Sequence, residues 1–548
     1  MSRKRAKVKK DNAKKAIIAV ILCLIIINAL FYAFTHVEGI SEYGDDVSYL
    51  PLSTGLITRG FLISPSNIFS VRLTEIFAIG FFYALFGVSS LTSTLWNITS
   101  YIGIIIVTFY TMRFFYDNKA ALLSAFLVSI FPMVTKYAVN ISEDIPLAFV
   151  CSLAVLLFLY AERSNKKVYY FFSGFFLVAT WLTSYEGALV IVFLFLYAFI
   201  ELLRKKIRID RTTLYFIYGI ALLFLIVFIY SYINSGKPFA TITINENFYS
   251  AVGASVNGFS TIPSAETHLN FYTDSMFDYN LINTFTHQHI GDALGTLSNQ
   301  LFGKDLTYES GLYFYLLIPI AVLLIVFREK RAFFLMFWFA FLWLGLEFGP
   351  MHVGLTTNPL GITYLLAHRL IRLLLIISVP LAGIIGIGLA KLLESKNKIM
   401  LIFGCVVVAF IMVVLYLNNY YTSNFWYYWQ HYPAELTMQA ANFVKTLNPS
   451  TPVYLEALYN NNIVEYSGGA MYVYLGEPFP GRVNFNIPNT TNCSGFQNDS
   501  YVIWAGPPHC NNWVNVLNIT AQKDIPDYIL PLEEPLFGYK ITNIYFVK

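Results

Sequence analysis

The segment AIIAVILCLIIINALFYAFTHVEGISEYGDDVSYL, residues 16–50, joins an uninterrupted apolar run to a polar loop that holds two adjacent aspartates. The apolar part, Ala16–Phe34, is long enough to cross a bilayer, which takes roughly 17–25 helical residues. Basic residues precede it and no A-x-A-like cleavage site follows it, so we expect an uncleaved first span. Asp45 and Asp46 then stand just beyond the bilayer, where a carboxylate pair serves either to solvate a loop or to form part of a functional site.

The composition of the whole chain is also typical of a membrane protein. Of the 548 residues, 57% are apolar and 12% are charged, whereas about 25% of a typical soluble domain is charged. The net charge of +4 is distributed over separate loops, so we do not expect nucleic acid as a partner. We predict a polytopic α-helical membrane protein.

Positive charge predicts the orientation, because lysine and arginine in short loops mark the cytosolic side. Basic clusters follow the N-terminus near residues 113–119, 163–167, 204–211, 328–331 and 391–398. This alternation predicts about eleven spans, at residues 16–34, 95–113, 119–138, 146–162, 168–184, 187–203, 212–232, 311–327, 332–349, 364–390 and 399–418. It requires the apolar run Ile68–Phe86 to lie along the interface instead of crossing.

The same topology divides the chain into three parts: a cytosolic N-terminus (1–15), a transmembrane domain (16–418) and an external C-terminal domain (419–548). Residues 35–94 would form the first external loop and residues 233–310 a large one. The C-terminal part mixes Gly, Pro and aromatic residues as short strands and turns do, after one helical stretch, so we expect a small mixed α/β fold. N-x-[ST] sequons at Asn489, Asn492, Asn498 and Asn518 fit an external surface and predict a glycoprotein.

The five cysteines divide by location. Cys23, Cys151 and Cys405 lie in apolar runs and are predicted to be core residues. Cys493 and Cys510 lie in the C-terminal domain, where an external location would allow a disulfide to persist, and we predict that they pair.

Carboxylates recur at the predicted external turns. Asp45 and Asp46 lie in the first external loop, Glu143 and Asp144 at the second external turn and Glu186 at the third. Ionisable groups at membrane depth are costly and commonly mark catalysis or a substrate path. Asp144 also has a structural explanation, because an acid complements a helix N-terminus. An acid at three consecutive turns nevertheless favours a functional site on the external face.

The order of these features resembles the C-type superfamily of membrane glycosyltransferases, and most closely glycosyltransferase family 39. That family includes dolichyl-phosphate-mannose protein mannosyltransferases and aminoarabinose transferases. Residues 45–49, DDVSY, are similar to its D-E-x-x-Y pattern, with Asp in place of Glu. Residues 86–89, FGVS, resemble the turn after its interfacial segment, and residues 144–149, DIPLAF, its second acidic element. Arg372 with Pro380 is similar to its late arginine and proline.

The chain also departs from the family pattern. Ser184 follows Leu182 and Thr183 where family members carry lysine, so no phosphate contact is carried over to that position. Trp181 and Gly187 resemble the catalytic subunits of oligosaccharyltransferases, another branch of the superfamily. The Trp-Trp-Asp-Tyr-Gly acceptor motif of that branch is absent from the C-terminal domain. The resemblance covers roughly residues 35–200 well and residues 364–390 loosely.

The resemblance implies transfer of a sugar from a polyprenyl (dolichyl) phosphate donor to a protein, lipid or glycan acceptor. The reaction would take place among membrane lipids, on the external face of a cell membrane that we expect to be archaeal. Asp45 would act as general base. The implied catalytic set is Asp45, Asp46 and Asp144. The resemblance implies that Tyr49, Glu143 and Glu186 contact the acceptor or support the catalytic residues. The leaving phosphate would be bound by basic side chains, with Arg372, Arg369, Lys136 and Arg59 as the candidates.

Two alternatives remain open from the residues. An oligosaccharyltransferase would use a lipid-linked oligosaccharide and bind Mg²⁺ or Mn²⁺ through Asp45, Asp144 and Glu143. A family 39-like enzyme implies no required cofactor and no assigned metal. A transporter or flippase would place its acids in mid-helix and show related halves with broken helices.

Overall fold

The computed structural model describes residues 2–37, 46–58, 68–204, 211–241, 243–244, 312–348, 350–357, 360–366, 371–455, 483–484, 496–504, 510–520 and 541–547. The helices are α1 (Ser2–Thr35), α2 (Asp46–Thr58), η1 (Ile68–Val71), α3 (Leu73–Phe86), α4 (Ser90–Phe115), α5 (Asn118–Ser129), α6 (Pro132–Ala138), α7 (Asp144–Ser164), α8 (Lys167–Thr183), α9 (Gly187–Leu203), α10 (Leu214–Ser235), α16 (Tyr313–Val326), α17 (Ala332–Phe348), η2 (Ile371–Ile377), α18 (Ser378–Leu392) and α19 (Lys398–Thr446). The strands are β1 (Pro350–Thr357), β2 (Leu360–Leu366), β3 (Val453–Leu455), β4 (Val483–Asn484), β5 (Ser500–Trp504), β6 (Trp513–Thr520) and β7 (Ile541–Val547).

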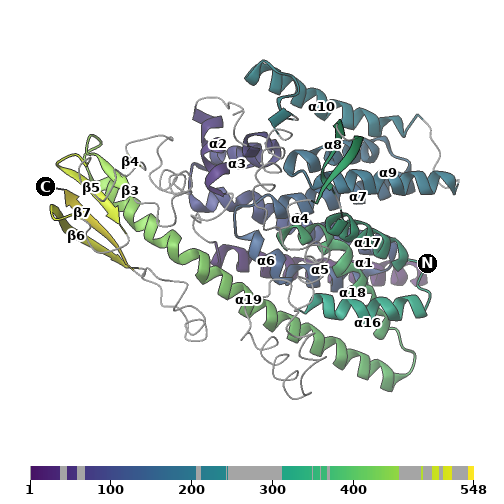
Figure 1. The fold of residues 1–548 in the computed structure, drawn as a ribbon. Helices are drawn as coiled ribbons and strands as arrows, with labels where there is room; N and C mark the ends of the chain where they lie inside the picture. The colour runs from purple at the N-terminus through teal and green to yellow at the C-terminus, as the bar shows by residue number, and fades with distance from the viewer. Residues whose placement is uncertain are drawn as a thin grey trace.

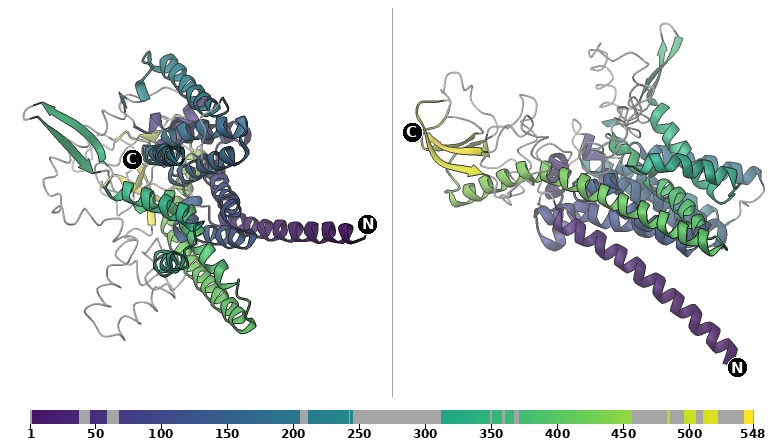
Figure 2. Two further views of the ribbon diagram at one scale, coloured as in Figure 1. Left: turned by 90° about the vertical axis from the view of Figure 1, so that its right-hand side faces the viewer. Right: turned by 90° about the horizontal axis from the view of Figure 1, so that it is seen from below.

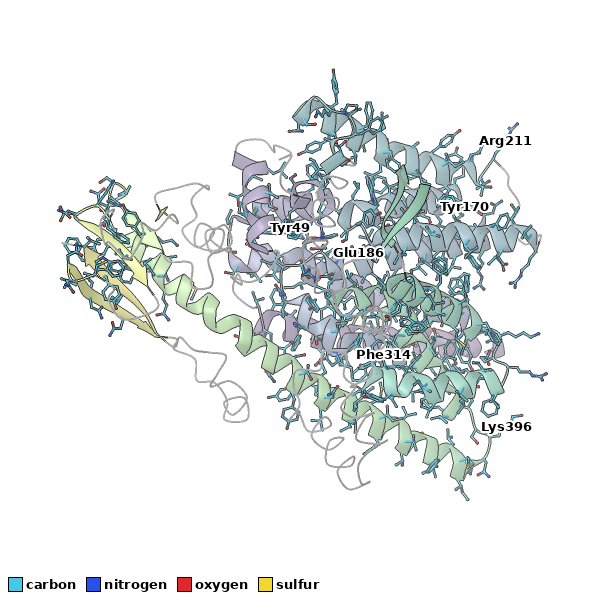
Figure 3. The ribbon with its side chains drawn as sticks, viewed as in Figure 1. Tyr49, Tyr170, Glu186, Arg211, Phe314 and Lys396 are labelled. Atoms are coloured by element: carbon cyan, nitrogen blue, oxygen red, sulfur yellow. The ribbon has the colours of Figure 1, made fainter. Side chains whose placement is uncertain are left out.

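Most helices form one bundle, and α19 leaves it to carry a small sheet (Figure 1). Figure 2 shows α1 diverging from the bundle toward the N-terminus and the β1–β2 hairpin projecting from it. We call the end of the bundle that faces the sheet the site end. We call the opposite end, where the N-terminus, Arg211 and Lys396 lie, the basic end (Figure 3). Basic residues that the sequence assigns to one side of the membrane therefore share one end.

Helix length and hydropathy support a multi-pass membrane protein. Within the described residues, 6 helices are long and apolar enough to span a membrane, or 7 with the bent pair α5–α6. Four further apolar helices of 10–17 residues include α9, α16 and α17, which coincide with predicted spans. The fourth is α3, within the run predicted to lie along the interface. The predicted number of eleven spans remains a prediction.

Three predicted elements differ in the structure. Residues 119–138 are not one helix, because α5 and α6 meet at an angle of 59°. Pro132 occupies the first turn of α6, where its missing N–H and fixed φ favour a new helix start. The predicted helix 364–390 is not helical at its start, because residues 364–366 belong to β2, which pairs with β1 as an antiparallel strand. Its described helical part begins at Ile371. Helix α4 begins at Ser90, earlier than predicted, because Ser89 and Thr92 form a capping box.

Helix α18 lies at the centre of the bundle. Within the apolar span Arg372–Leu392, all of residues 373–390 are buried. Its glycines allow close approach on several sides, since a Cβ at Gly386 would lie 2.0 Å from Ser124 Oγ and one at Gly383 would lie 2.6 Å from the Met112 side chain. Small residues let helix backbones approach in membranes, where packing rather than water exclusion drives association.

Helices α8 and α10 cross through a reciprocal pair of glycines. A Cβ at Gly174 would lie 2.1 Å from the carbonyl oxygen of Phe216, and one at Gly219 would lie 2.0 Å from that of Phe171. Both contacts are to backbone, so no side-chain rotation relieves them.

Gly174→Ala is therefore expected to push α10 off α8 and to destabilise the protein by about 1–3 kcal/mol, the usual cost of overpacking. Thermal unfolding in detergent measures the loss. Gly55→Ala is the matched control, because a Cβ at Gly55 meets no atom within 4 Å. Equal unfolding temperatures for the two variants would contradict the close packing described here.

The C-terminal strands form a sheet of 5 strands in the order β4-β3-β5-β7-β6. Strand β3 is parallel to β4 and β5, whereas β7 is antiparallel to β5 and β6. Buried Tyr454, Phe496, Trp513 and Tyr545 form its apolar core. Helix α19 is continuous across residue 419, the predicted start of the C-terminal domain, so the sheet stands on the far part of a helix that begins in the bundle.

The cysteines partly follow the prediction. Cys510 is disulfide-bonded. Cys493 lies outside the described residues, so its pairing with Cys510 stays a prediction. Cys151 is buried, but Cys23 and Cys405 are exposed and are not core residues as predicted, because they lie on helix faces turned away from the bundle.

Candidate active site

The described site is centred on the start of α7. Of the predicted site residues, Asp45, Arg59 and Arg369 lie outside the described residues. Asp46 begins α2, and its side chain is likewise not described. The others are placed, namely Tyr49, Lys136, Glu143, Asp144, Glu186 and Arg372. Tyr49 lies toward the site end (Figure 3).

Glu143 joins the first loop to α7. It stands at the N-cap of α7 and is only 2% exposed. Its Oε2 accepts a hydrogen bond of 2.7 Å from the Tyr49 hydroxyl in α2, and its Oε1 forms an ion pair with Arg72 at the N-cap of α3. Arg72 Nη1 also donates to the Tyr49 hydroxyl at 3.2 Å. A buried carboxylate needs such partners, because removing its charge from water is expensive.

Asp144 faces a cation from the other half of the chain. It lies in the first turn of α7 and is 1% exposed, and its Oδ2 is 3.4 Å from Nε of Arg372 in η2. The Arg372 side chain keeps 21% of its surface exposed. The two adjacent acids are thus each paired with an arginine, one from the segment before α3 and one from the segment before α18.

A buried asparagine supports the turn that leads to these acids. Asn97 of α4 donates hydrogen bonds from Nδ2 to the carbonyl oxygens of Ser142, at 2.7 Å, and Tyr137, at 3.3 Å. Lys136 lies in α6 and is also buried, and its Nζ is 5.0 Å from the centre of the Tyr137 ring. The segment between α6 and α7 is therefore held by α4 independently of the acids.

Glu186 is engaged locally. Its Oε2 accepts a hydrogen bond from the Ser184 hydroxyl, and it stands at the N-cap of α9. Burial raises the pKa of the neighbouring Tyr185 hydroxyl above its ordinary value, and the Glu186 carboxylate adds to this shift. These contacts agree with a structural role for Glu186.

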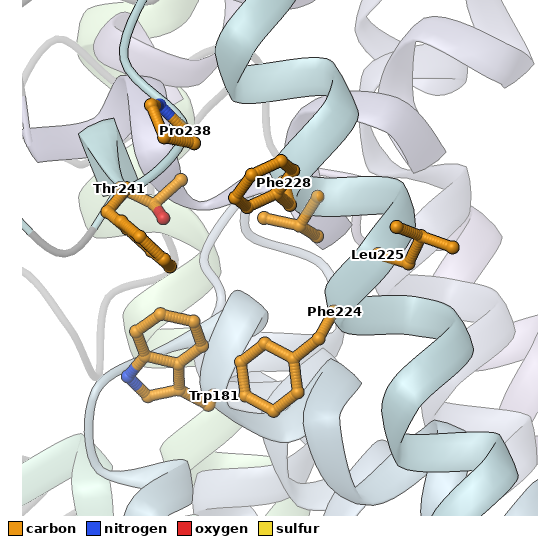
Figure 4. Close-up of a pocket in the computed structure, with 8 residues that line it drawn as sticks. Trp181, Phe224, Leu225, Phe228, Pro238 and Thr241 are labelled. Atoms are coloured by element: carbon orange, nitrogen blue, oxygen red, sulfur yellow. The ribbon is translucent and has the colours of Figure 1, made fainter.

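An apolar hollow of about 420 Å³ lies between the ends of α8 and α10 (Figure 4). Trp181, Phe224, Phe228 and Phe239 are among its lining residues, and Thr241 contributes the polar hydroxyl seen there. None of the site acids or arginines lines it. Its chemistry suits a hydrocarbon chain rather than a sugar or a phosphate.

The described residues do not form a metal site. No three His, Cys, Asp or Glu side chains among them are grouped as metal ligands would be. Glu143 and Asp144 already face Arg72 and Arg372, and a guanidinium beside each carboxylate disfavours a second cation. The two described members of the predicted metal set therefore do not fit an ion, while its third member, Asp45, lies outside the described residues.

Arg72 and Asn97 were not predicted. Of the two arginines in residues 35–94, only Arg59 is predicted from the sequence as a phosphate contact. The sequence signal for Arg72 is its position immediately before an apolar helix. A cation at membrane depth is costly unless it pairs with an anion or reaches the aqueous interface. Asn97 carries a comparable signal, because a carboxamide inside a 26-residue apolar helix needs a partner.

The chain is similar to known proteins both in part of its sequence and in its fold. Residues 74–231, which contain both acids of α7, match the sequence profile of the dolichyl-phosphate-mannose-protein mannosyltransferase family. The apo oligosaccharyltransferase of Archaeoglobus fulgidus superposes with a TM-score of 0.52 at 12% identity, over 88% of this chain and 65% of that protein. Apo ArnT from Cupriavidus metallidurans superposes with a TM-score of 0.51 at 13% identity, over 95% of this chain and 97% of ArnT. The chain has the C-type glycosyltransferase fold.

A second ArnT structure shares this C-type fold and contains a ligand. ArnT bound to undecaprenyl phosphate matches with a TM-score of 0.51 at 11% identity, over 95% of this chain and 97% of ArnT. No curated protein sequence matches the chain. The predicted C-type fold is thus confirmed, as is the prediction of a multi-pass helical protein with a small C-terminal sheet. The resemblance to family 39 has the support of the family profile over residues 74–231.

Proposed function

We propose that the chain transfers a sugar from a polyprenyl-phosphate donor to an acceptor at the site end. The observation that carries the proposal is the adjacent pair Glu143 and Asp144, buried at the start of α7 and each paired with an arginine from a different half of the chain. The family profile spans this pair. ArnT, which shares the fold, binds undecaprenyl phosphate. We propose the same class of donor lipid here.

The chemistry needs a base, a displaced phosphate and cations that stabilise it. Asp45 takes the proton from the acceptor hydroxyl, whose oxygen forms a bond to the anomeric carbon of the sugar. The bond between that carbon and the phosphate oxygen breaks, and the lipid phosphate leaves with the electron pair. Attack opposite the phosphate inverts the anomeric centre. Asp46 supports Asp45 in the same loop.

Arg372 is the first candidate to meet the leaving phosphate. Its guanidinium is partly exposed and lies 3.4 Å from Asp144. A guanidinium has five N–H donors in a planar fork, which suits it to bind a phosphate. Arg72 is held more tightly, by both Glu143 and the Tyr49 hydroxyl. We therefore assign Asp144 to orienting Arg372, and Glu143 and Tyr49 to holding the first loop. Arg369, Lys136 and Arg59 remain candidates for further phosphate contacts.

A donor panel tests the proposal. Purified protein in detergent is given radiolabelled polyprenyl-phosphate monosaccharides, with and without EDTA, and released or transferred sugar is measured. We expect turnover of at least one monosaccharide donor in the presence of EDTA. Failure with every such donor would overturn the proposal.

The oligosaccharyltransferase alternative is retained because the Archaeoglobus structure covers 88% of this chain at a comparable TM-score. The chain spans 65% of the length of that protein. Use of a lipid-linked oligosaccharide only, with activity lost in EDTA and restored by Mn²⁺ or Mg²⁺, would favour it over the monosaccharide donor.

We further propose that the site end and the sheet are external, with the basic end in the cytosol. Asn498 then gives a test, because it lies exposed in a sequon before β5. In glycosylation-competent microsomes we expect Asn498 to carry a glycan, seen by peptide mass spectrometry and removed in Asn498→Gln. Asn97, which also lies in a sequon, is an internal control, since its own side chain is buried in α4. An unmodified Asn498 in a membrane-inserted protein would speak against this orientation.

A further inference from the structure

Helix α19 carries an unusual run of buried polar side chains. Asn418, Asn419, Thr422, Ser423 and Asn424 are each at most 9% exposed, and we call this set the polar seam. The turns of α19 before it are apolar, with Phe403, Val406, Phe410 and Val413 exposed. Buried polar side chains are retained where they bond to specific partners. The partners of the polar seam therefore show what it holds.

One partner is Thr135 of α6. Its hydroxyl donates to Asn419 Oδ1 at 2.6 Å and lies 2.8 Å from the Ser423 hydroxyl. Ser423 in turn donates to Asn419 Oδ1 at 2.9 Å. All three side chains are buried, so the hydrogen bonds are protected from water. Helix α6 leads directly into the turn that presents Glu143 and Asp144.

The second partner is His36, which directly follows the last turn of α1. Its Nε2 is 3.0 Å from Asn424 Oδ1. The His36 ring stacks on Tyr32 with ring centres 4.2 Å apart and meets the edge of Tyr427 at 5.1 Å. In the sequence, Asp45 lies nine residues after His36. The polar seam thus bonds both to α6 and to the residue that directly follows α1.

At its other end α19 supports the sheet. The helix is continuous from the polar seam to Thr446. Ala440, Ala441 and Val444 are buried, and the Phe443 ring lies 5.5 Å from that of Tyr501 in β5. One uninterrupted helix therefore joins the sheet to α6, which precedes Glu143 and Asp144, and to the end of α1.

From this arrangement we infer that the polar seam positions the start of α7, with Glu143 and Asp144, relative to the end of α1 and to the sheet. Thr135 acts through the turn that follows α6, and His36 acts by fixing α19 to the end of α1. Both are positioning residues and do not touch the reacting atoms. This inference rests on the proposed function for its catalytic consequence. A displacement of about 1 Å at a reacting group is enough to lower a rate by up to 10²-fold.

Thr135 offers a matched pair of variants. Thr135→Val keeps the shape of the side chain and removes the hydroxyl, whereas Thr135→Ser keeps the hydroxyl. We expect Thr135→Val to lower kcat about tenfold with little change in the donor KM, and Thr135→Ser to remain close to wild type. His36→Phe, which keeps an aromatic ring but cannot bond Asn424, is expected to lower kcat in the same way.

A control at the basic end separates positioning from general stability. Tyr116→Phe removes the hydrogen bond of 2.9 Å to Glu394 Oε1, at the end of the bundle far from the acids. We expect it to leave kcat unchanged even where its unfolding temperature falls as far as that of Thr135→Val. Equal kcat for Thr135→Val and wild type would overturn the inference, as would an equal loss in Tyr116→Phe.

Hydrogen exchange provides a readout that does not need turnover. Backbone amides of residues 139–144 are expected to exchange faster in Thr135→Val than in Thr135→Ser or Tyr116→Phe. Unchanged exchange in Thr135→Val would overturn the positioning role. If the wild type turned over no donor, the proposed function would fail, while the exchange comparison would still decide whether the polar seam positions the turn.

Discussion

Asp45→Asn is expected to abolish sugar transfer in protein that remains folded. An asparagine side chain cannot accept the acceptor proton, and loss of a general base typically lowers a rate 10²–10⁴-fold. Transfer from the active donor of the panel measures the loss, and thermal unfolding in detergent shows whether the fold is retained.

Asp46→Asn is the natural comparison for this variant. It makes the same chemical change one residue further on, at the first residue of α2. We expect it to retain more activity than Asp45→Asn, because the resemblance assigns the base to Asp45. Undiminished turnover in Asp45→Asn would show that Asp45 is not the base, and a larger loss in Asp46→Asn would move the role to Asp46.

Arg372→Gln is expected to lower both stability and transfer. It removes the arginine that faces the Asp144 carboxylate, which is 1% exposed. Breaking a buried ion pair by removing one partner commonly costs 3–5 kcal/mol, because the other charge remains buried. Transfer should fall by about 10²–10³-fold if this guanidinium also stabilises the leaving phosphate. Thermal unfolding and donor turnover measure the two effects separately.

The double variant Asp144→Asn with Arg372→Gln separates the structural and catalytic roles. With both charges removed, most of the lost stability should return, since neither variant side chain carries an unpaired charge. Transfer should not return, because the cation that meets the phosphate is still missing. Recovery of transfer together with stability would show that Arg372 serves only to neutralise Asp144.

Local pattern was sufficient to locate the acids at helix starts. Ser142, Glu143 and Asp144 precede Pro146, and this order indicates a helix N-terminus with an acid near it. Helix α7 does begin at Asp144. The pairing of Asp144 with Arg372 could not be derived in the same way, because 227 intervening residues separate the two positions and no pattern within either segment refers to the other.

The partner of Glu143 was missed for a related reason. Arg72 and Arg59 are both single cations in one loop, and composition does not distinguish between them. Packing does so, because α3 places Arg72 against Tyr49 and Glu143. The polar seam was missed as well. Asn419 and Ser423 lie beyond an apolar run that was ended at residue 418, whereas the helix itself continues to Thr446.

The sequence by itself determined the membrane class, the approximate places of most helices and the helix start beside Glu143 and Asp144. These properties depend on run length, charge alternation and helix-start signals, all of which act within a few turns of chain. Only the tertiary structure decided which arginine meets Glu143 and which meets Asp144, where the span after α4 bends and how α19 contacts α6 and His36. Those outcomes depend on buried charges and hydroxyl groups finding partners from distant segments, and only the packed bundle brings these partners together.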